Sequence, residues 1–164
     1  MKILAVAGEL SGDAHGGPLL RELAARLPGF SAAGIGGPRM REAGLTPLFP
    51  LSALQVHGLV EVLRHLPRLF RVLGSLEARL DRERPDGVLL IDYPGFNLKV
   101  AQAARARGIP VIWYSSPQIW AWRGGRLKTI AREADKIIVL FPFEAAIYRE
   151  AGVDAAFLGH PLAG

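Results

Sequence analysis

The sequence contains no cysteine among its 164 residues, and this absence excludes disulfide bonds, thiolate metal sites and a cysteine nucleophile. No apolar run approaches the roughly 20 residues that a membrane span needs. The apolar start, residues 1–8, is too short for a signal peptide and leads directly into a glycine motif. We therefore expect a cytoplasmic protein, and a peripheral contact with the inner membrane stays open.

Metal-ligand spacing is also lacking. The four histidines, His15, His57, His65 and His160, show no pair separated by three residues. Such a pair would place two imidazoles on one helix face, where they could bind one ion. We expect no metal.

Aromatic residues are scarce, at 8%, yet all three tryptophans fall within ten residues: Trp113, Trp120 and Trp122. Arg123 and Arg126 follow them. A strand is expected to end at the start of this segment, and the carboxyl ends of parallel strands meet in the ligand crevice. The segment is therefore interpreted as part of a binding site rather than of the core.

The charge balance allows two interpretations. The net charge is +5, and sixteen of the twenty basic residues are arginine. This reflects either a compositional habit or an anionic partner, such as a phosphate or an anionic membrane surface. Arginines among aromatic rings are also typical of single-strand nucleic-acid binding, but here they occupy one short segment that fits one phosphate or headgroup. We expect no nucleic-acid partner.

Apolar runs and helical patterns alternate along the whole chain. This order predicts an α/β fold, a doubly wound, Rossmann-like parallel sheet with right-handed crossovers. Pro67, inside the longest helical pattern, predicts a kink or two helices. The expected strands are 2–7, 31–35, 45–49, 87–91, 110–114, 136–140 and 154–158, and the expected helices are 19–27, 39–43, 58–83, 96–107, 127–133 and 143–151.

The first glycine turn, residues 8–13, has neither the dinucleotide-binding nor the P-loop pattern. Asp13 in this turn is expected to cap the helix that follows. Glu9 would repel an anion at a helix start and therefore suits a sugar hydroxyl better. Ser116 does not lie in a nucleophile elbow, so its hydroxyl is expected to bind substrate.

Asp92 follows an apolar strand directly. A carboxylate at the mouth of a buried strand is partly desolvated, which raises its pKa toward that of a useful base. The alternative is that Asp92 caps the next helix, but Asn97 and the turn at Gly95 are better placed for that. We favour a functional Asp92.

The aliphatic segment 51–63 occurs where a loop is expected. It predicts either a helix packed on the sheet or a slot for acyl chains. In the second case Arg64, Arg68 and Arg71 would face anionic lipid.

With these motifs the chain resembles the N-terminal half of the lipid-A-disaccharide synthases, inverting glycosyltransferases of the GT-B architecture. Two departures are evident: Leu10 stands where the family usually has threonine, and Gly95 where it has a second aspartate. The motifs that carry the resemblance are 8–13, 36–40, 58–62, 91–97, 115–123, 140–144 and 159–161.

The resemblance implies a domain organisation. Residues 1–158 would form a Rossmann-like acceptor-binding domain, and residues 159–164 would begin a linker to a C-terminal donor domain that this sequence lacks. The UDP-sugar donor would bind that second domain. The chain alone would therefore be inactive, and no cofactor is implied.

The implied reaction joins UDP-2,3-diacylglucosamine to 2,3-diacylglucosamine 1-phosphate, giving a β-1,6 disaccharide of lipid A and UDP. Asp92 would be the catalytic base, near the inner membrane surface. The residues expected to bind substrate are Glu9, Ser11, Asn97, Ser116, Trp120, Trp122, Arg123 and Arg126, with sugar contacts from Ser11, Asn97 and Ser116 and phosphate contacts from Arg123 or Arg126.

Three alternatives stay open on the sequence alone. The chain could belong to another GT-B enzyme of UDP-sugars, although the tryptophan segment argues against this. It could be a binding module without catalysis. It could also be a flavodoxin-like protein that binds a nucleotide or flavin.

Overall fold

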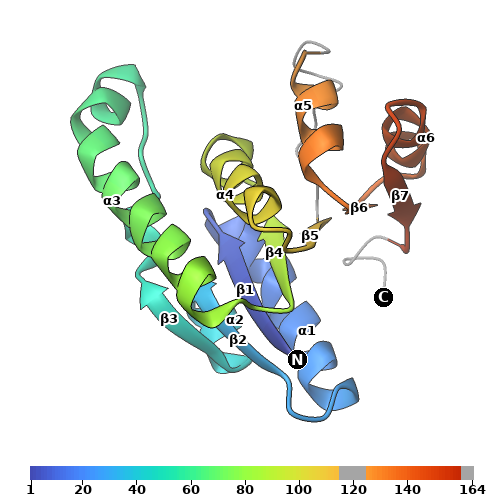
Figure 1. The fold of residues 1–164 in the computed structure, drawn as a ribbon, viewed down its shortest axis with the longest axis horizontal. Helices are drawn as coiled ribbons and strands as arrows, with labels where there is room; N and C mark the ends of the chain where they lie inside the picture. The colour runs from blue at the N-terminus through green and yellow to red at the C-terminus, as the bar shows by residue number, and fades with distance from the viewer. Residues whose placement is uncertain (115–124, 160–164) are drawn as a thin grey trace.

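The computed structural model describes residues 1–114 and 125–159, which form a seven-stranded, wholly parallel sheet with helices on both faces (Figure 1). The doubly wound, Rossmann-like α/β fold is thereby confirmed. The strands are β1 (Lys2–Ala7), β2 (Ser31–Ile35), β3 (Leu45–Phe49), β4 (Gly87–Ile91), β5 (Val111–Tyr114), β6 (Lys136–Val139) and β7 (Asp154–Phe157). The helices are α1 (Leu10–Arg26), α2 (Pro38–Glu42), the 3-10 turn η1 (Leu51–Ala53), α3 (Leu59–Glu83), α4 (Pro94–Ala106), α5 (Gly125–Glu133) and α6 (Pro142–Glu150).

The strand order is β3-β2-β1-β4-β5-β6-β7, so the direction of winding reverses between β1 and β4. The two strands are in register there, with Val6 opposite Leu90 and Ala7 opposite Ile91. Their carboxyl ends therefore lie side by side. In open α/β sheets this switch point is where ligands bind.

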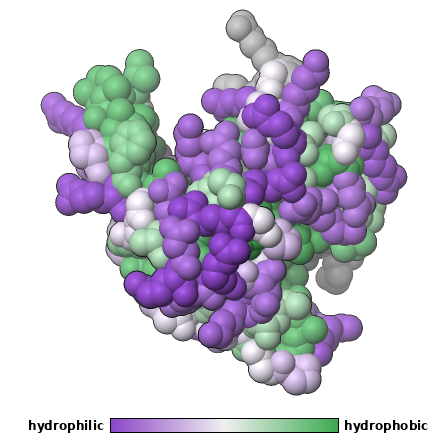
Figure 2. Space-filling view, in the orientation of Figure 1, coloured by the Kyte–Doolittle hydropathy of each residue, from purple (hydrophilic) through white to green (hydrophobic). Residues whose placement is uncertain are grey.

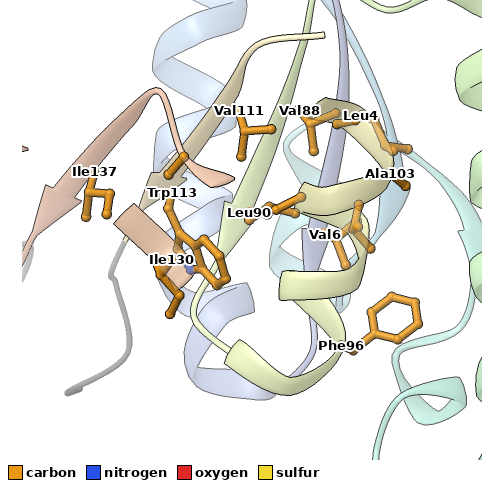
Figure 3. Close-up of a cluster of buried hydrophobic side chains, with 14 of the residues drawn as sticks. Leu4, Val6, Val88, Leu90, Phe96, Ala103, Val111, Trp113, Ile130 and Ile137 are labelled. Carbon is orange, nitrogen blue, oxygen red and sulfur yellow. The ribbon is translucent and has the colours of Figure 1, made fainter. Parts of the chain in front are cut away.

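The core on the α3 and α4 side contains the alternating apolar side chains of the central strands, several of which Figure 3 shows. Trp113 of β5 is among them and is completely buried. Its indole lies near Ile130 of α5 (Figure 3). The interpretation of all three tryptophans as site residues is therefore wrong for Trp113, because this residue lies inside a strand and faces the core.

The opposite face of the sheet is built from smaller residues, which let α1 and α2 approach closely. A Cβ atom on Gly16 would come within 2.7 Å of the Ile91 side chain and 2.6 Å of the Met40 sulfur. Asp13 lies here at 2% exposure, and its carboxylate accepts hydrogen bonds from the backbone amides of Arg39, at 3.0 Å, and Met40, at 2.9 Å. Asp13 thus caps α2 and not, as expected, its own helix.

The difference at Asp13 arises because α1 begins at Leu10. Only Gly8 and Glu9 of the glycine segment lie outside the helix, so Asp13 is already in its first turn. A carboxylate in that position reaches the neighbouring helix start, whose free N–H groups need an acceptor.

Helix α3 is continuous through Pro67, so the expected interruption does not divide it. Its N-terminal half extends past the carboxyl ends of the strands (Figure 1). Leu59, Val60 and Leu63 on this half are 61–79% exposed, whereas Leu76 and Leu80 further along are buried. Only the second half of α3 therefore packs on the sheet.

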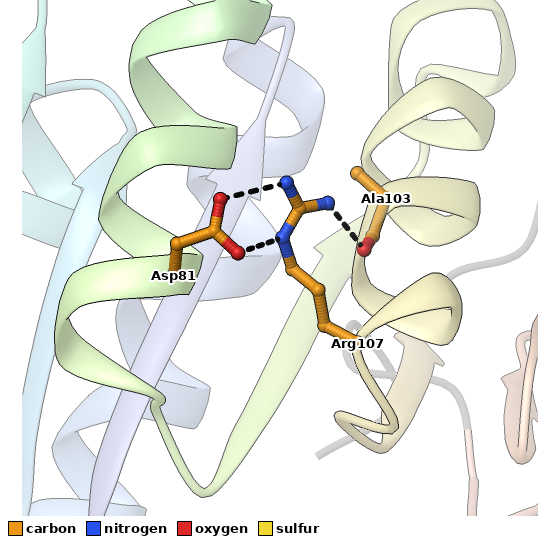
Figure 4. A network of polar contacts seen from close by, with 3 residues as sticks. All are labelled: Asp81, Ala103 and Arg107. Atoms are coloured by element: carbon orange, nitrogen blue, oxygen red, sulfur yellow. Dashed lines mark hydrogen bonds and ion pairs between the residues drawn. The ribbon is translucent and has the colours of Figure 1, made fainter.

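An ion pair joins the C-terminal ends of α3 and α4 (Figure 4). Arg107 donates from Nε and Nη2 to the two carboxylate oxygens of Asp81, at 2.7 and 2.9 Å, and from Nη1 to the Ala103 carbonyl at 2.9 Å. This guanidinium holds the pKa of Asp81 below its ordinary value. The bidentate pair links the two helices at the ends remote from the carboxyl edge of the sheet.

Candidate functional site

The switch point brings together Glu9, which follows β1, and Asp92 and Tyr93, which follow β4. Glu9 is exposed at the start of α1. Asp92 and Tyr93 both have left-handed backbone conformations, with φ of 49° and 48°. Such conformations are uncommon outside glycine, cost energy and gather at functional sites.

The Asn97 side chain stabilises the turn formed by Asp92 and Tyr93. It is completely buried, and its Nδ2 lies 2.8 Å from the Asp92 carbonyl oxygen and 3.3 Å from those of Val6 and Ile91. The side chain thus ties the ends of β1 and β4 to the turn that carries Asp92. The expected direct contact of Asn97 with sugar does not match this placement, because the amide is directed at backbone and closed off from solvent.

The Asp92 carboxyl is partly buried, and this desolvation raises its pKa above the ordinary value of 3.8. The backbone amide of Tyr93 and the charge of His15 act in the opposite direction without cancelling the effect. A raised pKa brings a carboxylate closer to the proton affinity that a general base needs.

His15, which the sequence pattern did not single out, lies near enough to Asp92 for its charge to act on that carboxyl. Its ring lies edge-to-face with that of Tyr114 at the end of β5, with centroids 6.4 Å apart and planes at 87°. The available signal was its spacing, because His15 follows Ser11 by four residues and so lies on the same face of α1.

Two cavities open at this edge of the sheet. The larger, about 470 Å³, lies against α3 and the start of α4 and is lined mainly by apolar side chains, among them Val62, Leu66, Phe70 and Phe96. The smaller, about 400 Å³, has a more polar lining that includes Ser11, Gln55 and His57. Both volumes fall within the roughly 300–1,000 Å³ typical of small-molecule sites.

The remaining expected site residues divide into two groups. Ser11 lines the smaller cavity with Glu9, and Arg126 is exposed in the first turn of α5. Ser116, Trp120, Trp122 and Arg123 lie outside the described residues. Among residues 1–114 and 125–159, no helix combines the length and apolarity that a bilayer crossing requires.

Solved structures with this fold include enzymes of UDP-sugars. A UDP-GlcNAc 2-epimerase from Neisseria meningitidis, bound to UDP-GlcNAc, superposes with a TM-score of 0.71 at 12% identity, covering 98% of this chain and 46% of that one. MurG from Acinetobacter baumannii superposes with a TM-score of 0.56 at 18% identity, covering 86% and 41%. At these identities the likeness shows the GT-B fold alone.

Sequence comparison is more specific. The family model of lipid-A-disaccharide synthetase matches residues 3–164. The lipid-A-disaccharide synthases of Alkalilimnicola ehrlichii and Geobacter sulfurreducens are each 50% identical over 99% of this chain, which spans 43% and 42% of their respective lengths. The match thus covers nearly the whole chain but under half of each relative. This chain belongs to the lipid-A-disaccharide synthetase family.

Proposed function

We propose that this chain forms the acceptor-binding half of a glycosyltransferase that makes the lipid A disaccharide. The observation that carries the proposal is the position of Asp92, a carboxylate with a raised pKa at the switch point, directly before Tyr93 and Pro94, which line an apolar cavity. Family membership suggests the reaction, and the proposal takes Asp92 as the base and the apolar cavity as the surface that suits an acylated sugar.

The proposed division of labour follows from chain length. Residues 1–158 would bind the acceptor, and residues 159–164 would begin the connection to a donor-binding domain that holds the UDP-sugar. The relatives are more than twice as long as the segment they share with this chain. The neighbouring epimerase structure carries UDP-GlcNAc, which is the nucleotide class proposed here for the donor.

The chemistry needs one base. Asp92 takes the proton of the acceptor 6-hydroxyl as that oxygen attacks C1 of the donor sugar, and the bond from C1 to the UDP oxygen breaks. The sugar inverts at C1, UDP leaves with the bonding electron pair, and the proton remains on Asp92. A general base placed in this way contributes typically ~10²–10⁴-fold to the rate.

The site divides naturally for an acylated glucosamine phosphate. The apolar cavity would hold acyl chain, and Glu9 and Ser11 would orient the sugar. Arg126, exposed at the start of α5, would bind the acceptor phosphate together with Arg123. An arginine suits this role because its guanidinium can bind phosphate oxygens bidentately.

The exposed start of α3 would contact the cytoplasmic face of the inner membrane. Leu59, Val60, Leu63 and Phe70 are 61–79% exposed, and Figure 2 shows an apolar surface over this end of the molecule. Arg64 and Arg71 are exposed nearby, whereas Arg68 donates to the Ser52 carbonyl at 3.1 Å. Apolar side chains next to free arginines are typical of peripheral binding to anionic lipid.

Replacing Leu59 and Leu63 together with serine is expected to weaken binding to anionic phospholipid vesicles at least tenfold. Burying one leucine side chain contributes about 1.5–3 kcal/mol, and tenfold corresponds to about 1.4 kcal/mol. Sedimentation with vesicles measures the partition. Leu158→Ser is the matched control, because Leu158 is 73% exposed but lies at the end of β7, away from α3. Equal loss in both variants would contradict a binding surface on α3.

The isolated chain is expected to bind short-acyl 2,3-diacylglucosamine 1-phosphate at one saturable site, measured by calorimetry, and to release no UDP when UDP-2,3-diacylglucosamine is added. Glucosamine 1-phosphate without acyl groups should bind at least tenfold more weakly, because it buries less apolar surface. Tight binding of UDP or flavin without binding of the acceptor would instead identify a nucleotide-binding module and overturn the proposal.

A further inference from the structure

The two cavities at the switch point adjoin along three shared residues. Glu9, Val56 and Tyr93 line both the apolar cavity and the polar one. The linings differ on either side of these residues: mainly leucines, valine and phenylalanine with Lys99 on one, and Ser11, Gln55 and His57 with Leu10 on the other. The boundary between the apolar cavity and the more polar one therefore runs along this shared wall.

Tyr93 is held in this wall at several points. Its backbone is left-handed, at φ 48°, and its carbonyl accepts the first hydrogen bond of α4 from the amide of Asn97 at 3.2 Å. At the other end its hydroxyl donates to the carbonyl of Leu54, a completely buried residue after η1. The side chain thus extends from the end of β4 to the segment that follows β3.

The ring itself lies directly against Gly8 at the end of β1. A Cβ atom on Gly8 would come within 2.2 Å of two atoms of the Tyr93 ring. The absence of a side chain at position 8 is therefore what lets the ring lie across the strand end. Burial, and then the charge of Glu9, raise the pKa of the Tyr93 phenol, so the hydroxyl stays protonated and remains a donor at neutral pH.

We propose that Tyr93 is a specificity-determining residue: it closes the apolar cavity toward the polar one and so limits the length of acyl chain that the site can bury. This inference rests on the proposed function, which places an acylated sugar at these cavities. An acyl chain then ends at the ring, and the more polar cavity stays free for the hydroxyl groups of the sugar. Without the ring, the two volumes of about 470 and 400 Å³ would be joined.

The expected signature is a plateau in affinity. Each methylene that becomes buried adds roughly fourfold to the binding constant, and a methylene that stays in water adds nothing. Affinity should therefore rise with acyl length until the apolar cavity is filled, and then level off. Opening the wall should move this plateau to longer chains.

The test measures binding of 2,3-diacylglucosamine 1-phosphates, from butanoyl to dodecanoyl, to the full 164-residue chain by calorimetry below their micelle concentrations. Four proteins are compared: the unmodified chain, Tyr93→Phe, Tyr93→Ala and Gly8→Ala. Tyr93→Phe keeps the ring and removes only the hydroxyl. Gly8→Ala keeps Tyr93 but displaces its ring, so this variant tests the wall even if Tyr93→Ala fails to fold. The amide NMR spectrum of each variant reports whether it is folded.

We expect the unmodified chain and Tyr93→Phe to reach the plateau at the same acyl length. In Tyr93→Ala and Gly8→Ala the plateau should lie at least two methylenes further, so the longest ligands should bind more than tenfold better relative to the shortest. An unchanged plateau in every folded variant would overturn the role of Tyr93 but leave the acceptor site intact. Failure of all four proteins to bind any member of the series would overturn the proposed function, and the role of Tyr93 with it.

Discussion

Replacing Asp92 with asparagine in the complete enzyme is expected to lower kcat by about 10²–10⁴-fold, with little change in the KM for the acceptor. Asparagine has the same shape and tolerates the left-handed backbone, so the turn should persist. What is lost is the basic carboxylate that takes the proton of the acceptor hydroxyl, because an amide oxygen accepts a hydrogen bond but is too weak a base to take the proton. Initial rates of UDP release measure the effect.

Glu9→Gln is the matched control, because Glu9 lies at the same switch point but is proposed only to orient the sugar. It should raise the KM for the acceptor more than it lowers kcat. A turnover number that is unchanged in Asp92→Asn, or that falls equally in both variants, would contradict the assignment of Asp92 as the base.

The pH dependence follows from the direction of the Asp92 pKa. The base must be ionised, so kcat/KM should fall as the pH falls through the pKa of Asp92. Because desolvation raises that pKa, this acid limb should lie above the ordinary carboxyl value of 3.8. The limb should be absent from the residual activity of Asp92→Asn.

Replacing Asn97 with aspartate is expected to cost about 3–5 kcal/mol of unfolding free energy at neutral pH. The side chain is completely buried, and its amide faces three backbone carbonyl oxygens. A carboxylate there would lose the donor and place its charge against those oxygens. Typical domains are stable by only about 5–15 kcal/mol, so urea unfolding should show the loss clearly.

The pH dependence of the stability of Asn97→Asp tests whether the loss comes from the buried charge. Burial would raise the pKa of the new carboxyl in the folded state above its unfolded value of about 3.9. The part of the penalty that comes from the charge should be complete above the folded pKa and disappear as the pH falls below the unfolded one, whereas the part that comes from the lost amide hydrogen bonds remains. Asn97→Ser, which loses the bonds without adding charge, should cost about 1–3 kcal/mol at every pH. Equal stability of Asn97→Asp and the unmodified chain at neutral pH would show that the Asn97 amide does not bind these backbone carbonyl oxygens.

Local patterns predicted the strands well where glycine bounds a buried run. The ranges 2–7, 31–35 and 87–91 match β1, β2 and β4 to the residue. The position of Asp92 at the mouth of a strand followed from the same pattern, because residues after a buried parallel strand emerge at the carboxyl edge of the sheet.

The features that the sequence argument missed depend on contacts between distant segments. Asp13 caps a helix that begins 25 residues later, and the Tyr93 hydroxyl donates to a carbonyl 39 residues away. Trp113 belongs to the core because its strand position faces α5, which the clustering of tryptophans did not reveal. Periodicity and motif spacing report on neighbours along the chain, so contacts across the sheet stay hidden from them.

A crystal structure of the complete enzyme with 2,3-diacylglucosamine 1-phosphate bound tests the central claim most directly. The distance to measure runs from the acceptor 6-hydroxyl oxygen to the nearer carboxylate oxygen of Asp92. We predict a value of roughly 2.6–3.2 Å, the reach of a general base. An acceptor whose 6-hydroxyl meets a different carboxylate, or that binds away from the ends of β1 and β4, would contradict it.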